Sequence, residues 1–505
     1  MTNFARAIKE EKNYTLTENA AVALKSTGTA LLDLFSQAGA IRVKTDEEVS
    51  RLFQAAFAED KLLATKLMFY TRNIRGGLGE RATFRKMLLS LAKSNPDIVV
   101  KNMELIPFFG RYDDLYVLTD SSIAPRVQTA MWDFLRETFM QDYRNMQEKR
   151  PVTLCAKWLK SINTSSKGSV ILGRLTAKNF GMTERQYRKA VSKLREYIKV
   201  IERTMSAQEW EDIAYAQVPS RAMKNYRKAF SKHDNERFGE YIEKVTKGEA
   251  KINSSTLYPY DILEAAGMKY QDHFSIDKDD VLEAQWKALP NYIKKAINAL
   301  VMADTSGSMQ GRPMAIALSL AIYFAERNTG AYKDLFLTFS QRPEFVELSG
   351  NTLREKISHI RSIVANTDLE AAMDAILNVA IRNKVSQEEM PKYLIVISDM
   401  HFDGASNVIS DGWGYGGRNI ASNPTFHQSM KEKFARAGYE MPTIVYWNVD
   451  QRSPALQAKA NDKGVLLASG ASTSVFKSII NNMGTTPLEF MLEVLNDPQY
   501  DMVEI

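Results

Sequence analysis

The stretch Ala299-Leu-Val-Met-Ala-Asp-Thr-Ser-Gly-Ser-Met309 decides the fold of the C-terminal part of this chain. An apolar run typical of a buried β-strand ends in Asp304, and Ser306 and Ser308 follow at alternate positions. A turn of small residues then leads into a helical pattern over 313–327. A carboxylate and two hydroxyls at the carboxyl end of a buried strand form one edge of an oxygen-lined cation site. The stretch therefore predicts an α/β domain with a metal site, although a helix cap is an alternative role for these three residues.

Two further loops offer matching oxygen ligands. Thr367 and Asp368 precede an amphipathic stretch over 369–380, and Asp399 follows a second apolar strand over 393–398. Because hydroxyl ligands carry no charge, an ion held partly by them keeps much of its own charge and attracts an outside carboxylate or phosphate. We predict a site for Mg²⁺ or Mn²⁺ formed by Asp304, Ser306, Ser308, Thr367 and Asp399.

The sequence lacks the motifs that other metal-binding, phosphate-binding or hydrolytic sites require. A dehalogenase-type phosphatase needs a second acid two residues after the first, where Ser306 stands instead. The chain contains no GxxxxGK[ST] phosphate loop and no GxSxG nucleophile elbow. Its five histidines are scattered without zinc-ligand spacing, and we interpret His401 as an ordinary loop residue. We therefore expect the protein not to be an enzyme.

Alternating strand-like and helical stretches after residue 296 predict one doubly wound α/β domain, similar in architecture to Rossmann-like folds. A tight antiparallel hairpin is expected at its edge, near 339–345. The predicted strands cover 297–303, 335–339, 345–348, 393–398, 443–449 and 465–468, and the predicted helices cover 314–327, 353–364, 369–381, 425–437 and 474–482.

The glycine-rich segment from Phe402 to Pro424 follows Asp399 directly. Four glycines between 412 and 417 exclude a helix or a regular strand there. The position beside the metal site favours a loop that selects the ligand, and a flexible linker is the alternative.

Length and composition set further bounds. A chain of 505 residues with 45% apolar residues is long enough for two to four globular domains. The single cysteine, Cys155, excludes a disulfide within the chain and favours a reducing compartment. Neither a signal-like N-terminus nor a run of about 18 apolar residues is present, so we expect a cytoplasmic protein without a membrane partner.

The first 290 residues show helical spacing of apolar residues almost throughout. Short breaks suggest an antiparallel solenoid of HEAT-like repeats, with a compact bundle as the alternative. The predicted helices cover 47–58, 61–72, 80–93, 97–106, 126–148, 184–204 and 225–247.

Positive charge gathers within this helical part. Residues 152–260 contain 21 Lys and Arg against 11 Asp and Glu, a balance of +10, whereas the whole chain carries +6. Aromatic residues are interleaved with the cations, as in surfaces that neutralise phosphates and stack on unpaired bases. A solvated helix face is the alternative interpretation. Our candidate RNA-binding residues are Arg174, Lys178, Arg185, Arg188, Lys189 and Lys193.

Several motifs together resemble the Ro ribonucleoprotein family, in which a TROVE-type helical repeat module is joined to a von Willebrand factor A domain. The resemblance is closest to a divergent, uncharacterised branch found in plants, fungi and viruses. It extends over roughly residues 60 to 490 and is carried by Arg75-Gly-Gly-Leu-Gly-Glu-Arg81, Phe109-Gly-Arg-Tyr-Asp-Asp-Leu115, Lys251-Ile-Asn-Ser-Ser-Thr-Leu-Tyr-Pro259, Asp304-Thr-Ser-Gly-Ser-Met309, Ser398-Asp-Met-His-Phe-Asp403 and Pro442-Thr-Ile-Val-Tyr-Trp-Asn448.

The resemblance implies a ring of helical repeats that binds single-stranded RNA ends or small structured RNA, joined to an A domain with a metal-ion-dependent adhesion site. Arg75, Arg81 and Arg111 could either hold helix ends or contact phosphate. We expect a helical module over 1–290, an A-like domain over 291–484 and a C-terminal tail over 485–505 docked on the helices. The expected function is RNA binding of Ro type. The alternative is a protein adaptor whose metal ion grips an acidic residue of a partner.

Overall fold

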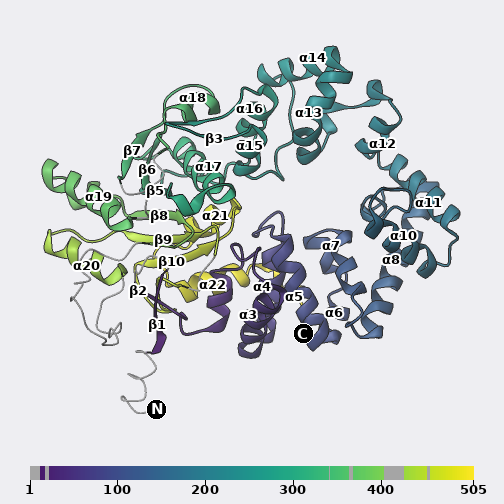
Figure 1. Cartoon of the computed structure of the whole chain (residues 1–505), viewed down its shortest axis with the longest axis horizontal. Coiled ribbons are helices and arrows are strands. Elements are labelled where there is room, and N and C mark those ends of the chain that lie inside the picture. The colour runs from purple at the N-terminus through teal and green to yellow at the C-terminus, as the bar shows by residue number, and fades with distance from the viewer. Residues whose placement is uncertain (1–11, 18–21, 340–341, 363–367, 403–425, 452–454) are drawn as a thin grey trace. The chain divides into compact units, whose positions relative to one another are not determined.

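The computed structural model describes residues 12–17, 22–339, 342–362, 368–402, 426–451 and 455–505 (Figure 1). The chain divides into two compact units. The sheet unit contains residues up to 45 together with 257–497, and the helical unit contains 46–256 together with 498–505. Within the described residues, no helix combines the length and apolar character that crossing a bilayer requires.

A six-stranded sheet forms the centre of the sheet unit (Figure 1). All neighbouring strands are parallel except the edge pair β6 and β7, which is antiparallel. The predicted strands and edge hairpin are therefore confirmed. In spatial order the strands are β10 (Val465–Ser469), β9 (Thr443–Asn448), β8 (Tyr393–Ser398), β5 (Ala299–Asp304), β6 (Leu335–Phe339) and β7 (Glu344–Glu347).

Helices cover both faces of this sheet. On one face, Leu300 and Met302 of β5 share a core with α19 (Leu369–Asn383) and α20 (Phe426–Arg436). On the other, α17 (Arg312–Arg327) and α21 (Ser474–Asn481) pack through Phe476, whose ring lies 4.7 Å from that of Trp447. Alternate residues of a strand point to opposite faces of the sheet. The side chains of these buried apolar strands therefore pack against the helices on both faces. The predicted α/β architecture is confirmed.

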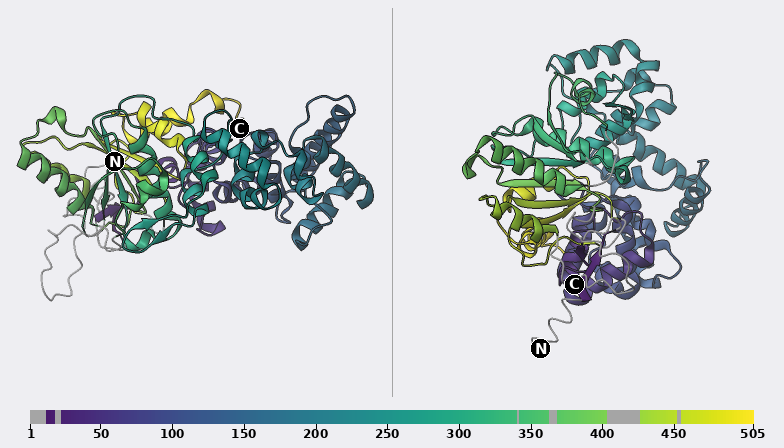
Figure 2. Two further views of the ribbon diagram at one scale, coloured as in Figure 1. Left: turned by 90° about the horizontal axis from the view of Figure 1, so that it is seen from above. Right: turned by 60° about the vertical axis from the view of Figure 1, so that its left-hand side comes forward.

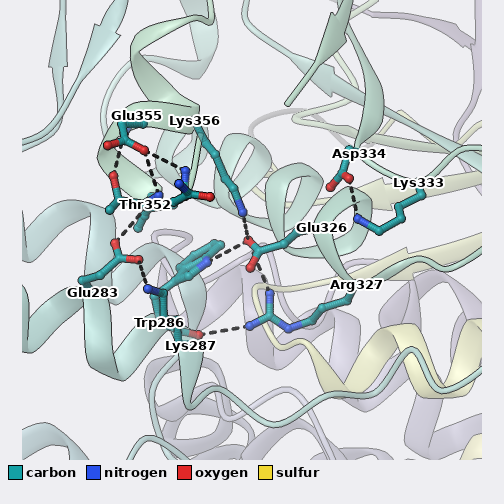
Figure 3. Close-up of polar contacts among 12 residues, drawn as sticks. Glu283, Trp286, Lys287, Glu326, Arg327, Lys333, Asp334, Thr352, Glu355 and Lys356 are labelled. Atoms are coloured by element: carbon teal, nitrogen blue, oxygen red, sulfur yellow. Dashed lines mark hydrogen bonds and ion pairs between the residues drawn. The ribbon is translucent and has the colours of Figure 1, made fainter. Parts of the chain in front are cut away.

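A half-buried polar network holds two further helices against α17 (Figure 3). Glu326 accepts a hydrogen bond from the Trp286 indole of α16 (Asp280–Lys287) at 3.0 Å. It also pairs at 3.5 Å with Lys356 of α18 (Leu353–Ser358). Arg327 donates to the Trp286 carbonyl at 3.0 Å. These contacts explain why residues 280–290 belong to the sheet unit rather than to the helical unit.

The helical unit is a succession of helices in which sequence neighbours pack on one another, and short connections join them (Figures 1 and 2). Its main elements are α3 (Asp46–Glu59), α4 (Lys61–Arg72), α5 (Arg81–Ser94), α6 (Pro96–Lys101), α7 (Leu105–Phe109), α8 (Pro125–Gln147), α9 (Cys155–Trp158), α10 (Lys167–Asn179), α11 (Glu184–Tyr197), α12 (Ile201–Ser206), α13 (Ser220–His233) and α14 (Asn235–Thr246).

Four predicted helices end earlier or divide. The helix predicted over 184–204 breaks into α11 and α12 because Lys199 adopts a left-handed backbone with φ of 50°. The helix predicted over 225–247 begins at Ser220 and breaks at Asp234, whose φ is −143°. The helix predicted over 97–106 is divided between α6 and α7, and that over 353–364 ends at Ser358. Apolar spacing alone does not mark such breaks, since it continues across them.

The unit boundaries differ from the predicted domains. Residues before 46 belong to the sheet unit, where Leu24 pairs with Leu456 and the Phe35 ring lies 5.7 Å from that of Phe490. Residues 257–290 also belong there. The tail divides: α22 (Pro487–Leu495) packs on β10, whereas 498–505 belong to the helical unit, where Tyr500 is fully buried.

Candidate metal centre and basic surface

Asp304 is the last residue of the central strand β5 and is fully buried. Its Oδ1 accepts a hydrogen bond from the Ser306 backbone N–H at 2.9 Å. Its Oδ2 accepts from the hydroxyl of Ser398, which ends the neighbouring strand β8. Sequence reasoning missed Ser398. Its role depends on the parallel pairing of β5 and β8, which places Ile397 beside Ala303.

The two serine hydroxyls of the motif lie together. Ser306 is buried, Ser308 is half-buried, and their Oγ atoms are 3.2 Å apart. The short 3₁₀ turn Gly307–Met309 follows, and Gly311 takes a φ of 90° just before α17 begins. The turn thus directs both hydroxyls to the same place beside Asp304.

Asp399 follows β8 directly and is buried. Its Oδ1 accepts a hydrogen bond from the His401 backbone N–H at 3.2 Å. Its Oδ2 is buried without a hydrogen-bond partner among the described residues. A buried carboxylate oxygen without a partner is costly, so this atom is suited to binding a cation.

Four of the five predicted metal-site residues are therefore brought together: Asp304, Ser306, Ser308 and Asp399. The fifth, Thr367, lies outside the described residues, as does segment 403–424. Asp368 caps α19, because its carboxylate accepts the Ala371 N–H at 2.8 Å. Across the described chain, no three His, Cys, Asp or Glu side chains converge on one point, so two carboxylates with hydroxyls form this cluster.

Burial and, after it, the nearby charge of Asp399 together raise the pKa of Asp304 to about 7. Hydrogen bonds from Ser306 and Ser398 act in the opposite direction. Two buried carboxylates beside one another repel, and a divalent cation would remove that repulsion. The donor set of carboxylates and hydroxyls fits Mg²⁺ or Mn²⁺, which prefer oxygen ligands.

The site has the position that open α/β sheets use for ligands. From β5 the chain runs to β6 on one side, and β8 lies on the other, so the strand order reverses between β5 and β8. Ligands in such sheets bind outside the carboxyl ends of the strands at this reversal. Asp304 and Asp399 lie at those two ends.

We expect the free energy of unfolding of the metal-free protein to fall as pH rises from about 4 to about 7. The pKa of Asp304 is raised from 3.8 to about 7 by folding, so between these values the folded state binds the extra proton. The stabilisation is complete below pH 3.8 and is lost as pH rises through about 7. Chemical denaturation at several pH values measures this slope. Equal slopes in wild type and Asp304→Asn would contradict the assignment.

The six candidate RNA-binding residues are all exposed and lie on α10 and α11. Arg185, Arg188, Lys189 and Lys193 share one face of α11 at three- and four-residue spacing. The opposite face carries the buried Tyr187, Val191 and Leu194. We call these four cations the α11 stripe.

The α11 stripe has no acidic partner within 4 Å among the described residues, and Lys178 has none either. Arg174 differs, because its Nε pairs at 3.0 Å with Glu184. Arg195 on the same helix is structural, since it donates to the Ala156 and Leu159 carbonyls at 2.9 and 2.7 Å. The stripe is therefore an uncompensated positive surface.

Comparison with known proteins gives two partial family matches. Residues 298–498 match the model of a domain of unknown function (DUF7788), and this span contains the five predicted metal-site residues. Residues 17–112 and 172–298 match the model of another domain of unknown function (DUF2828), and this span contains α11. An uncharacterised protein of Acanthamoeba polyphaga mimivirus is 27% identical over an alignment of 532 positions, which spans 96% of this chain and 87% of that protein. None of these descriptions names a ligand or activity.

Proposed function

We propose that this chain is a non-enzymatic RNA-binding protein of Ro type. The helical unit binds single-stranded ends or small structured RNA, and the sheet unit carries a metal-dependent ligand site. The α11 stripe is the observation that carries this proposal, because four exposed cations without acidic partners among the described residues share one helix face. Such cations neutralise backbone phosphates and release counterions, which favours RNA binding independently of base sequence.

We also infer the finer architecture from the resemblance noted in the sequence. The sheet unit is proposed as a von Willebrand factor A-like domain, and the strand reversal at Asp304 and Asp399 supports this. The helical unit is proposed as a TROVE-type module of HEAT-like repeats, which the packing of successive helices supports.

In the proposed metal centre, the hydroxyls of Ser306 and Ser308 and the carboxylates of Asp304 and Asp399 would hold the ion, with Thr367 as a further ligand. When bound, the ion supplies a positive charge that attracts an external carboxylate or phosphate. The residues around the ion orient the ligands and keep water away from them. Ser398 and the Ser306 N–H orient the Asp304 carboxylate, and burial excludes water around it.

A protein adaptor is the alternative function, and the metal centre favours it. An ion held largely by uncharged hydroxyls retains the charge needed to bind an acidic residue of a partner protein. In that case the helical unit would be an interaction platform, and the α11 stripe would be a solvated surface.

Binding titrations with two probes separate these functions. We expect a fluorescent single-stranded RNA to bind at about 0.1 M salt, with affinity falling by about 0.7 log units per phosphate contact for each log unit of salt. Chelation of divalent ions should leave this binding intact. An acidic peptide that binds only in the presence of Mg²⁺, together with no RNA binding, would favour the adaptor instead.

A further inference from the structure

A second group of arginines in the helical unit surrounds the buried carboxylate of Asp114. Asp114 is fully buried and accepts hydrogen bonds from Arg72 Nε at 2.8 Å and Arg85 Nε at 2.7 Å. Arg85 also pairs with Asp113 at 3.1 Å. Paired in this way, the carboxylates fix the guanidinium groups rather than leaving them to move in solvent.

Gly110 allows this close packing. A Cβ at this position would lie 2.6 Å from Asp114 Oδ2 and 2.8 Å from Arg72 Nε. Both distances are shorter than van der Waals contact, so any larger residue would displace the ion pair. The Phe109-Gly-Arg-Tyr-Asp-Asp motif is therefore, in part, a structural support for these arginines.

Arg111 lies next to this support and has a different role. Its guanidinium is half-buried and stacks 4.4 Å from the centre of the Trp158 ring. No described carboxylate lies within 4 Å of that guanidinium. Arg72 is 2% exposed, and its Nη2 has no hydrogen-bond partner among the described residues. Thus two neighbouring guanidinium groups have donors that the described part of the chain does not use.

The surrounding charge is strongly positive. Arg81 and Arg221, both exposed, lie near enough to contribute to Arg111's electrostatic environment. Burial lowers the pKa of Arg111, and the charges of Arg72, Arg221 and Arg81 lower it too, whereas Asp113 raises it. Without Arg221, the four arginines Arg72, Arg81, Arg85 and Arg111 still outnumber the two carboxylates Asp113 and Asp114.

We propose that this arginine cluster, centred on the half-buried Arg111, is a binding site for a phosphate group. A phosphate has several acceptor oxygens and a charge of about −1 to −2, and the planar fork of a guanidinium matches it with two parallel hydrogen bonds. The contact with the Trp158 ring restrains the Arg111 guanidinium before a ligand binds, which lowers the entropic cost of binding.

The phosphate group could come from two sources: the backbone or terminus of a nucleic acid, or a free phosphate ion. The nucleic-acid source rests on the function proposed above, whereas the site itself does not. The cluster is distinct from the α11 stripe, because none of its arginines lies on α10 or α11.

Calorimetry with inorganic phosphate and anisotropy with 5′-phosphorylated and 5′-hydroxyl single-stranded RNA test this site in the full chain. We expect Arg111→Gln to weaken binding of at least one phosphate probe by about tenfold or more, since the variant cannot form the charge-assisted bidentate contact. Arg81→Gln, at an exposed position, should weaken the same probe by a smaller factor without a change in Tm. Arg126→Gln is the control, because Arg126 is exposed and already pairs with Asp97 at 3.1 Å.

The outcomes distinguish this site from the proposed function. Loss confined to RNA probes identifies a nucleic-acid phosphate, and loss confined to the ion identifies free phosphate. Inorganic phosphate binding that requires Arg111, in a protein that binds no RNA, would support the site and reject RNA binding. Wild-type affinity for all three probes in both Arg111→Gln and Arg81→Gln would overturn the site even if reversal of the α11 stripe abolished RNA binding.

Discussion

Replacing Asp304 with asparagine is expected to weaken Mg²⁺ and Mn²⁺ binding by at least about a hundredfold. Even residues that only orient the direct ligands of a metal ion contribute about 10- to 100-fold to the metal affinity. The variant removes one of the two buried carboxylates while keeping the size of the side chain. Calorimetric titration at about pH 7.5 to 8 measures the effect. At this pH the Asp304 carboxylate, whose pKa is about 7, is mostly ionised in the wild-type protein.

Two comparisons make this experiment specific. Asp280→Asn removes the same charge from an exposed position at the start of α16 and should leave metal affinity unchanged. Without metal, Asp304→Asn should be at least as stable as wild type near neutral pH, since the buried repulsion with Asp399 is gone. A folded Asp304→Asn protein with wild-type metal affinity would show that the cluster is not the metal site.

Reversing the α11 stripe to glutamate is expected to weaken single-stranded RNA binding on the order of a hundredfold at about 0.15 M salt. Because four phosphates would no longer be neutralised, the salt dependence should also decrease by about 2.8 log units of affinity per log unit of salt. The effect should be similar for RNAs of different sequence, because phosphate contacts carry little base information. Anisotropy titrations at two salt concentrations measure both quantities.

A matched control reverses four exposed cations of the sheet unit. Lys294, Lys295, Arg382 and Lys392 carry the same total charge as the α11 stripe. Either reversal changes the net charge by −8, from +6 to −2. If both quadruple variants lose RNA affinity equally, the effect comes from net charge and the stripe is not a binding surface. If neither loses affinity, the stripe is a solvated helix face.

The two surfaces should act independently. The α11 stripe belongs to the helical unit and Asp304 to the sheet unit. We therefore expect Asp304→Asn to bind RNA with wild-type affinity, and the stripe variant to bind Mg²⁺ with wild-type affinity. Loss of both activities in either variant would contradict this independence.

The sheet, and the grouping of most of the predicted metal-site residues at its edge, could be predicted from the sequence because their signals are local. A fully buried parallel strand is apolar on both faces, so β5 and β8 are visible as continuous apolar runs that end in Asp304 and Asp399. The alternate spacing of Ser306 and Ser308 is also local. In contrast, the hydrogen bond from Ser398 to Asp304 depends on which strands are neighbours in the folded sheet, and the sequence does not show this order.

Other features could not be predicted from the sequence because they depend on tertiary contacts. The backbone of Lys199 interrupts a helical pattern that continues in sequence on both sides. Residues before 46 join the sheet unit through contacts with segments far along the chain, such as Phe35 with Phe490. The stacking of Arg111 on Trp158 likewise joins two distant segments, and neither residue reveals the other in the sequence.

Photo-crosslinking of 4-thiouridine-labelled single-stranded RNA to the full chain, followed by mass spectrometry of the linked peptides, tests the central proposal of RNA binding most directly. We predict crosslinks in α10 and α11, over 167–197, and near Trp158, with competition by unlabelled RNA. Crosslinks confined to the sheet unit, or none that unlabelled RNA competes away, would contradict an RNA-binding helical unit.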